Sequence, residues 1–373
     1  MQPKSKTMKN IFGKAILLAT ALLFSITGTS CSNDDNTTPE KEKTYNVSGF
    51  AKGADVSWLT EMEKDGVKFY NQNGKATECM KLLREEGTNS IRLRVWVNPE
   101  GGWCGKDDVI AKAWRAQQLG FRLMIDFHYS DTWADPSSQT VPAAWRNYSF
   151  SEMKKAVADH TSDVLNALKA QGVTNVEWVQ VGNETRDGML WNDAEGDESK
   201  AVTGRASKNA ANFAAYINAG YDAVKAVYPE AKVVVHVDKG EDLGGLTWLY
   251  DQLKNNGGKW DVIGLSLYPE DNNWKSYAES CLANIQTLSS KYGKDVIVSE
   301  IGMWWGSDQA APMMKKMVNG CKAISTCEGI FYWEPEVYNN WKPANYSSLG
   351  WDAYTKGAFD NSGKPTAVFD AYK

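Results

Sequence analysis

Short apolar runs rich in Val and Ile recur along the chain, and the longer runs between them have apolar residues at helical spacing. The short runs predict eight strands, at residues Ser48–Asp55, Ser90–Val97, Arg122–His128, Val176–Glu184, Lys232–Asp238, Val262–Tyr268, Val296–Glu300 and Gly329–Trp333. The longer runs predict helices at Lys75–Glu86, Val109–Leu119, Ser151–Gln171, Lys208–Val227, Leu246–Lys254, Tyr277–Tyr292 and Ala310–Ile324.

This alternation of strands and helices predicts a parallel sheet, because neighbouring parallel strands must be joined by a crossover, usually a helix. Eight strands at intervals of roughly 30 to 50 residues match an α/β fold of the (β/α)8 TIM barrel type, in a single domain. A doubly wound open sheet is the alternative. It is disfavoured because the chain contains no GxGxxG or P-loop motif.

Polar and aromatic residues gather on one face of the predicted strands as each strand ends. Side chains alternate between the two faces of a strand, so Gln180, Gly182 and Glu184 are expected to share a face. The same counting groups other strand-end residues: Arg92 with Arg94 and Trp96, Asp126 with His128, His236 with Asp238, Gly264 with Ser266 and Tyr268, Val296 with Val298 and Glu300, and Phe331 with Trp333. Such a pattern is typical of a barrel that is packed below and opens to an active rim above.

Two glutamates at the ends of the fourth and seventh predicted strands, Glu184 and Glu300, are the candidate catalytic pair. Paired carboxylates facing each other across a cleft are the machinery of glycoside hydrolysis. In a retaining mechanism we expect Glu300 to be the nucleophile, kept ionised by Arg92 or Arg94 and by the hydroxyl of Tyr268. Glu184 would be the acid/base, with a pKa raised by burial and by the charge of Glu300.

The N-terminal segment resembles a bacterial lipoprotein signal. Four lysines precede or enter an apolar run over residues 15–26, which leads through small residues to Cys31. We therefore expect residues 1–31 to be a signal with Cys31 lipidated, the alternative being ordinary signal cleavage. The acidic residues after Cys31 resemble a tag for the outer face of the outer membrane, so we expect lipid anchoring there and membrane contact through the lipid only. Residues 32–45 read as a flexible tether and residues 46–373 as the folded domain.

Charge and cysteine content limit the other function classes. Removing residues 1–31 takes away four Lys and no acidic residue, so the net charge moves from −5 to −9. An acidic chain argues against nucleic-acid binding, which depends on basic residues at phosphates. The remaining cysteines do not have the spacing of a zinc site, and Cys321 and Cys327 could form a local disulfide or stay as buried thiols.

Several strings in the chain together resemble glycoside hydrolase family 53, the endo-β-1,4-galactanases. They are GADVSW (53–58), IRLRVWVNP (91–99), IDFHYSDTWADPSSQTVPAAW (125–145), VGNE (181–184), LSLYP (265–269), VSE (298–300) and YWEP (332–335). The resemblance implies a retaining enzyme that cuts the galactan side chains of pectin.

The resemblance also implies roles for residues around the two glutamates. Asn183 would contact the sugar 2-hydroxyl, Tyr268 would touch the nucleophile, and Trp333 would form the floor for the bound sugar. The long third string would bring Asp126, His128, Asp131, Trp133 and Asp135 toward the sites flanking the cut. Together with these residues we expect the substrate-binding and supporting set to include Asp55, Arg92, Arg94, His236, Asp238 and Trp304.

The chain departs from the family in two loops. Trp304 and Trp305 follow Glu300 where many members have a Thr, and either could stack on substrate. The stretch 334–352 is shorter than the loop that holds structural calcium in some bacterial members and contains no His, so we expect no copy of that site and no cofactor for the chemistry. Asp352 and its neighbours leave another calcium arrangement open.

We expect a monomer acting on a polysaccharide. The alternatives are another retaining β-glycanase, such as a mannanase or glucanase, and a non-catalytic glycan-binding lipoprotein.

Overall fold

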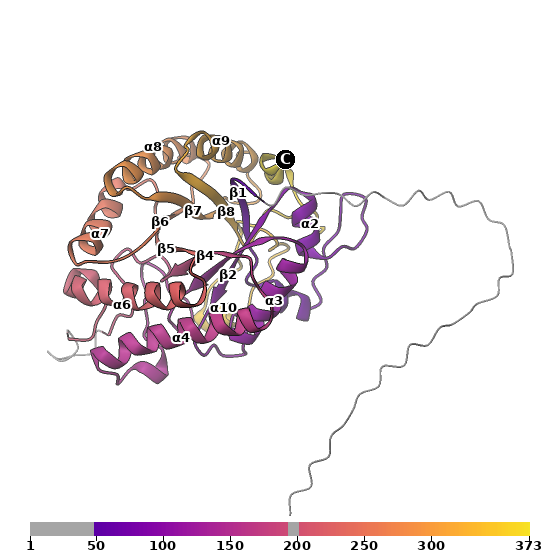
Figure 1. Cartoon of the computed structure of the whole chain (residues 1–373). Helices are drawn as coiled ribbons and strands as arrows, with labels where there is room; N and C mark the ends of the chain where they lie inside the picture. The colour runs from indigo at the N-terminus through magenta and orange to yellow at the C-terminus, as the bar shows by residue number, and fades with distance from the viewer. Residues whose placement is uncertain (1–47, 193–200) are drawn as a thin grey trace, which may run out of the picture. The chain divides into compact units, whose positions relative to one another are not determined.

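Eight parallel strands close into a barrel in the order of the chain (Figure 1). The structure is a computed structural model that describes residues 48–192 and 201–373. Its strands are β1 (Ala51–Asp55), β2 (Ser90–Val95), β3 (Arg122–Phe127), β4 (Val176–Val181), β5 (Lys232–Val237), β6 (Val262–Leu267), β7 (Asp295–Ile301) and β8 (Cys327–Trp333). The predicted (β/α)8 barrel is therefore confirmed.

Helices surround the strands, as Figure 1 shows. They are α1 (Leu59–Lys64), α2 (Cys79–Glu85), α3 (Lys106–Gln118), α4 (Phe150–Ala170), α6 (Ala206–Val227), α7 (Leu243–Asn255), α8 (Trp274–Tyr292), α9 (Ala310–Ala323) and α10 (Ala344–Leu349), with 3-10 turns at Ala143–Trp145 and Ala367–Tyr372. Local chemistry sets several helix starts. Ser149 and Glu152 form a reciprocal capping box at α4, and the Glu78 carboxylate caps α2, which therefore begins at Cys79 rather than at the expected Lys75.

The apolar residues form two separate cores. One lies inside the barrel and consists of Ala51, Met124, Trp178, Val234, Val262, Ile297 and Phe331. The other lies between the strands and the surrounding helices, and includes Val296 and Val298 of β7. The inner core has a residue from every strand except β2, whose Arg92 lies in a buried polar network instead. Most of the other strands therefore read as nearly continuous hydrophobic runs.

The expected alternation in β7 is wrong. Ile297, not Val296 and Val298, faces the barrel interior. The pairing of β7 with β6 and β8 shifts register around residues 298–301, so one residue is inserted before Glu300. Such a bulge reverses the face of everything that follows it, and Glu300 reaches the barrel mouth for that reason.

The five cysteines from Cys79 onward are free and buried, so the alternative of buried thiols holds for Cys321 and Cys327. Among the described residues, no helix is long and apolar enough to span a membrane. The expected signal, the lipidated Cys31 and the tether lie outside the described residues.

Candidate active site

Glu300 lies at the carboxyl end of β7, with a cation on one oxygen and a phenol on the other. Nη1 of Arg92 is 2.9 Å from its Oε1, and the hydroxyl of Tyr268 donates to Oε2 at 2.7 Å. Both groups stabilise the ionised carboxylate. The predicted contacts of Arg92 and Tyr268 with the candidate nucleophile are therefore present.

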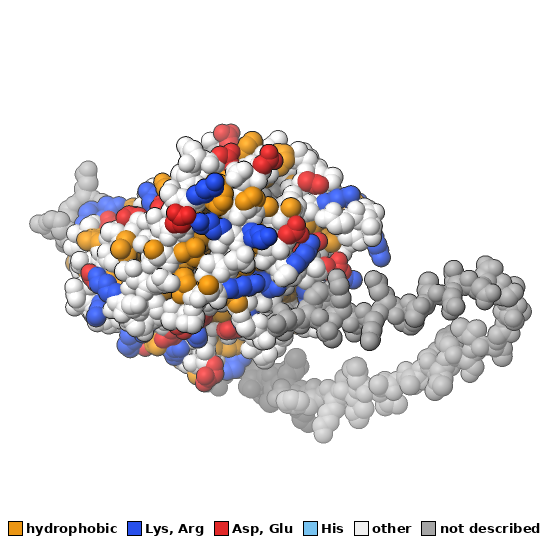
Figure 2. Space-filling view, turned by 90° about the horizontal axis from the view of Figure 1, so that it is seen from above, with side chains coloured by type: hydrophobic (Ala, Val, Ile, Leu, Met, Phe, Trp, Pro, Cys, Tyr) orange, Lys and Arg blue, Asp and Glu red, His pale blue; other side chains and the backbone are white. Residues whose placement is uncertain are grey.

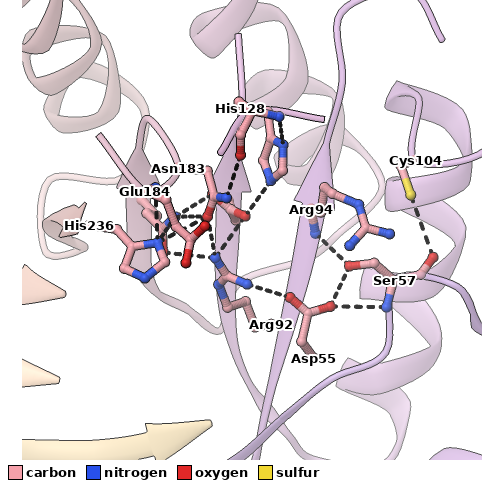
Figure 3. A network of polar contacts seen from close by, with 12 residues as sticks. Asp55, Ser57, Arg92, Arg94, Cys104, His128, Asn183, Glu184 and His236 are labelled. Carbon is pink, nitrogen blue, oxygen red and sulfur yellow. Dashed lines mark hydrogen bonds and ion pairs between the residues drawn. The ribbon is translucent and has the colours of Figure 1, made fainter. Parts of the chain in front are cut away.

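Arg92 is the centre of a buried polar network (Figure 3). Its guanidinium makes ion pairs with Asp55 at 2.7 Å and Asp126 at 2.9 Å, in addition to Glu300. It also donates from Nη2 to the side-chain oxygens of Gln180 at 3.1 Å and Asn183 at 2.9 Å. These carboxylates raise the pKa of Arg92 and offset the lowering effect of its burial.

Asn183 and Glu184 reach the site through a turn, not through a continued strand. β4 ends at Val181, and the next residue, Gly182, has φ +85°. A Cβ at Gly182 would lie 2.7 Å from Thr185 Cγ2, so the turn needs glycine. Glu184 itself has φ +45°. The expected extension of the strand to Glu184 is wrong, and the turn brings both neighbours, Asn183 and Glu184, to the site where alternation would have separated them.

The carboxyl of Glu184 accepts a hydrogen bond from Ser266 Oγ at 2.8 Å. Burial raises its pKa well above the usual range, and the negative charges of Glu300 and Asp238 raise it further. Ser266 pairs with Glu300 in the β6–β7 register, so one residue of β6 stands beside both glutamates. This environment keeps Glu184 protonated, as a general acid requires.

Burial also raises the pKa of Glu300, to about 7, while Arg92 and the Tyr268 hydrogen bond lower it. Oε1 of Glu184 is bonded by the neutral hydroxyl of Ser266, whereas Oε1 of Glu300 is bonded by the positively charged guanidinium of Arg92. The pair therefore divides into a carboxylate that ionises first and an acid that keeps its proton, which is the division that a retaining mechanism needs.

An aromatic wall lines one side of the mouth around Trp133 and Trp333, whose ring centroids are 6.0 Å apart. The buried guanidinium of Arg94 lies 4.3 Å from the Trp133 ring and makes an ion pair with Glu334 at 3.0 Å. Trp333 also meets Tyr268 edge-on at 6.4 Å, next to Glu300. Apolar ring faces beside the two glutamates suit the C–H face of a sugar.

The histidines of the predicted set are buried in this network. His128 Nε2 lies 3.0 Å from Asp126, and its Nδ1 accepts from Trp96 and from the Ala134 amide. His236 lies between Asn183 and Ser266. Burial lowers the pKa of both rings, so both are neutral at pH 7.

The remaining predicted residues are less closely tied to the two glutamates. The Asp131 carboxylate accepts hydrogen bonds from the backbone amides of Asn98 and Ala143. The Asp135 carboxylate accepts hydrogen bonds from the amides of Ser137 and Ser138 in a turn. Asp238 pairs with Arg186, and Trp304 is 51% exposed on the loop after β7. Their roles toward a substrate stay predictions.

Three positions that the sequence did not single out as site residues also belong to the network. Gln180 bridges Arg92 and Asp126, Glu334 holds Arg94, and Ser266 bonds Glu184. Alternation along the predicted strands placed Gln180 and Ser266 on the correct faces, and this was the feature of the sequence that could have identified them as site residues. Glu334 follows its strand, and the partner of its carboxylate is visible only in the folded chain.

Among the described residues, no group of three or more His, Cys, Asp or Glu side chains could hold a metal ion. A (β/α)8 barrel with an acid and an ionised carboxylate at its mouth defines the class of glycoside hydrolases.

Comparison with known proteins identifies the family. The model of glycosyl hydrolase family 53 matches residues 51–313. A probable arabinogalactan endo-β-1,4-galactanase A of Neosartorya fischeri is 34% identical over 316 residues, covering 78% of this chain and 85% of the relative. An endo-β-1,4-galactanase of Bacillus subtilis is 30% identical over 349 residues, covering 83% and 75%. The chain belongs to glycosyl hydrolase family 53.

A solved structure supports the same conclusion. The catalytic domain of a family 53 enzyme from Ignisphaera aggregans superposes with a TM-score of 0.75 at 29% identity, covering 88% of this chain and 96% of that one.

Proposed function

We propose that this enzyme is a retaining endo-β-1,4-galactanase that acts on galactan and on the type I arabinogalactan side chains of pectin. The observation that carries the proposal is that the two glutamates have different hydrogen-bond and ion-pair partners. Arg92 and Tyr268 contact Glu300, and Ser266 alone of these three side chains contacts Glu184. Membership of family 53 and the galactanase relatives supply the substrate class.

Each glutamate has one role in the first step. Glu300 attacks the anomeric carbon, and Glu184 gives its proton to the departing glycosidic oxygen. The bond to the leaving sugar breaks as the bond from Glu300 forms, which leaves a covalent galactosyl-enzyme. Arg92 and Tyr268 orient the attacking carboxylate through its two oxygens.

In the second step Glu184 acts as a general base instead of a general acid. Its carboxylate takes a proton from a water molecule, which attacks the anomeric carbon and releases Glu300. Two displacements at the same carbon retain the β configuration.

Asn183 and Trp333 are the proposed contacts for the reacting sugar. The Asn183 amide nitrogen donates to Ala134 O at 2.8 Å, and this bond fixes the amide so that its second N–H can meet a sugar hydroxyl. Trp333 offers a half-buried ring next to Tyr268. We place His128, Asp131, Trp133, Asp135, Asp238 and Trp304 in or around the flanking subsites.

Azide rescue tests the two roles directly. Glu184→Ala should lose most activity on galactan, because the leaving sugar is no longer protonated. On an activated aryl β-galactoside the same variant should be accelerated by azide, which attacks the galactosyl-enzyme and forms a β-galactosyl azide. Glu300→Ala should form an α-galactosyl azide from an activated galactoside. Thermal melting of each variant serves as the folding control. Wild-type turnover of galactan by either variant, or rescue with the opposite stereochemistry, would refute the assignment.

Digestion of galactan, mannan and glucan with reducing-end analysis over time tests the substrate. We expect rapid shortening of galactan into a series of oligosaccharides, which is the mark of endo cleavage. Faster cleavage of mannan or glucan would favour the alternative β-glycanase. Binding to galactan without new reducing ends would favour the non-catalytic alternative.

We also propose that the enzyme is a lipid-anchored monomer on the outer face of the outer membrane. The support is the sequence of residues 1–35, with its lysines, apolar run, Cys31 and acidic tag. Labelled palmitate should be incorporated into the native chain but not into Cys31→Ala. Protease added to intact cells should digest the domain, and light scattering of the domain should give the mass of one chain. A chain that stays unlabelled or protected would contradict the anchoring.

A further inference from the structure

The carboxyl of Glu184 ends a chain of hydrogen bonds that starts on β5. Ser266 Oγ lies 2.8 Å from Glu184 Oε1 and 2.8 Å from Nε2 of His236. His236 and Ser266 are almost completely buried, with exposed fractions of 0% and 1%. Water therefore does not compete for these bonds, and the direction of each bond is determined by the atoms themselves.

The backbone amide of Glu184 sets the direction at the first ring nitrogen. This N–H points to His236 Nδ1 at 3.3 Å, and a backbone amide can only donate. Asn183 Oδ1 also lies 3.0 Å from Nδ1, but this oxygen already accepts from Arg92 Nη2 at 2.9 Å and from Gln180 Nε2 at 3.0 Å, which occupy its two lone pairs. Nδ1 is therefore assigned as the acceptor of the Glu184 amide, so it carries no proton. Burial and the nearby Arg92 charge lower the pKa of His236 well below its usual value, so the ring is neutral. A neutral imidazole without a proton on Nδ1 carries it on Nε2.

The remaining bonds follow from the proton on Nε2. The Nε2–H donates to Ser266 Oγ, and the single hydroxyl hydrogen of Ser266 is then directed to Glu184 Oε1. We propose, on the basis of the function inferred above, that Ser266 is a positioning residue for the proton donor, through a one-way chain from His236 to Ser266 to Glu184. Oε1 is permanently an acceptor in this chain. The proton that Glu184 transfers is therefore on Oε2.

This arrangement matters when Glu184 becomes charged. In the first step the proton leaves Oε2 for the glycosidic oxygen, and the new negative charge is shared with Oε1, where Ser266 donates. Three acidic groups face Glu184 and raise its pKa: Glu300 on β7, Asp238 after β5, which is paired with Arg186, and Asp135 in the loop after β3. The Ser266 hydrogen bond acts in the opposite direction and lowers that pKa.

Ser266→Ala is the direct test. Removing a donor to the charged form should raise the pKa of Glu184, and activity is lost as pH rises through that pKa. We expect the alkaline limb of kcat/KM on galactan to move up by about one pH unit and the rate below that limb to fall about tenfold. The acid limb, which reports Glu300, should stay in place.

The matched control is Ser299→Ala. Ser299 is a buried hydroxyl on the neighbouring strand β7, and within the described residues its Oγ has no hydrogen-bond partner. This variant should keep the wild-type alkaline limb. An equal shift in both variants, or no shift in Ser266→Ala, would overturn the proposal.

An activated substrate separates proton donation from general structural damage. A dinitrophenyl β-galactobioside has a leaving group that departs without protonation, so Ser266→Ala should form the galactosyl-enzyme from it at nearly the wild-type rate. Equal losses on this substrate and on galactan would show a merely structural role.

His236 provides a second pair of variants if Ser266→Ala does not fold. His236→Gln places an amide nitrogen near the original Nε2 and should keep the alkaline limb, whereas His236→Leu should shift it as Ser266→Ala does. An unshifted limb in His236→Leu would overturn the proposal. If the wild type cleaves mannan or glucan instead of galactan, the proposed function fails, and the same comparisons on that glycan still decide the role of Ser266.

Discussion

Arg92 Nη1 lies 2.9 Å from Oε1 of Glu300, with the arginine fully buried and the glutamate side chain 6% exposed. The same guanidinium also pairs with Asp55 and Asp126, so one cation meets three carboxylates in a region without bulk water. A buried charge that loses its partner is strongly destabilising. The bond that orients the Glu300 carboxylate is therefore also part of what holds β1, β2, β3 and β7 together.

Arg92→Met should lose both activity and stability. It leaves Asp55, Asp126 and Glu300 buried without their cation, and we expect the free energy of unfolding to fall by about 3 to 5 kcal/mol at pH 7. Urea denaturation measures the loss, and galactan hydrolysis should become undetectable. Arg92→Lys keeps the positive charge but lacks the planar guanidinium with its several N–H donors. Its stability and activity should therefore lie between those of the wild type and those of Arg92→Met. Wild-type stability of Arg92→Met would contradict the role given to this network.

Tyr268→Phe should move the acid limb of the pH profile. The Tyr268 hydroxyl lowers the pKa of Glu300, which burial raises to about 7. Removing the donor raises that pKa further, and the nucleophile must be ionised, so activity should be lost at a higher pH as the solution is acidified. A hydrogen bond to a charged group corresponds to a shift of about one pH unit or somewhat more. The measurement is kcat/KM against pH, and a limb that stays in place or moves down would contradict it.

Glu334→Gln should weaken the aromatic wall. Glu334 accepts from Arg94 Nη1 and from the amide of Trp58, and Arg94 in turn packs on Trp133. Loss of the buried carboxylate should lower the free energy of unfolding by about 3 to 5 kcal/mol and raise KM for galactan.

A pair near the surface provides the control for Glu334→Gln. Glu63, which pairs with Arg115, is 35% exposed, and Glu63→Gln should cost less than about 1 kcal/mol. Similar losses of stability in the two variants would show that the burial of Glu334 does not matter.

Trp304→Ala should raise KM for long galactan several-fold with little change in kcat. Trp304 is 51% exposed and follows the nucleophile strand, so it can stack on a sugar beyond the reacting one. Trp114 is 43% exposed on α3 and is the matched control. Isothermal titration with galacto-oligosaccharides measures the loss of affinity. Equal affinities of the Trp304 and Trp114 variants would exclude a subsite at Trp304.

The same contacts show which parts of the candidate site could be predicted from the sequence. It located both glutamates and Tyr268 because each follows an apolar run and strand ends meet at one rim, and it located Arg92 by alternation within its predicted strand. Ser266 was placed on the correct face, but its bond to Glu184 joins residues 82 positions apart. The partner of Glu334 is 240 positions away, and no periodicity reports such a distance.

The sequence by itself determined the order of the elements, the barrel class and the position of Glu184 and Glu300 near the ends of apolar runs, because hydrophobic periodicity and helix caps are local properties of the chain. Only the tertiary structure decided how Glu184 and Glu300 reach the mouth. The turn at Gly182 and the bulge before Glu300 both break the alternation on which counting depends. A side chain's face after such a break is set by pairing with neighbouring strands. The direction of the His236, Ser266 and Glu184 hydrogen bonds likewise exists only where β4, β5 and β6 lie side by side.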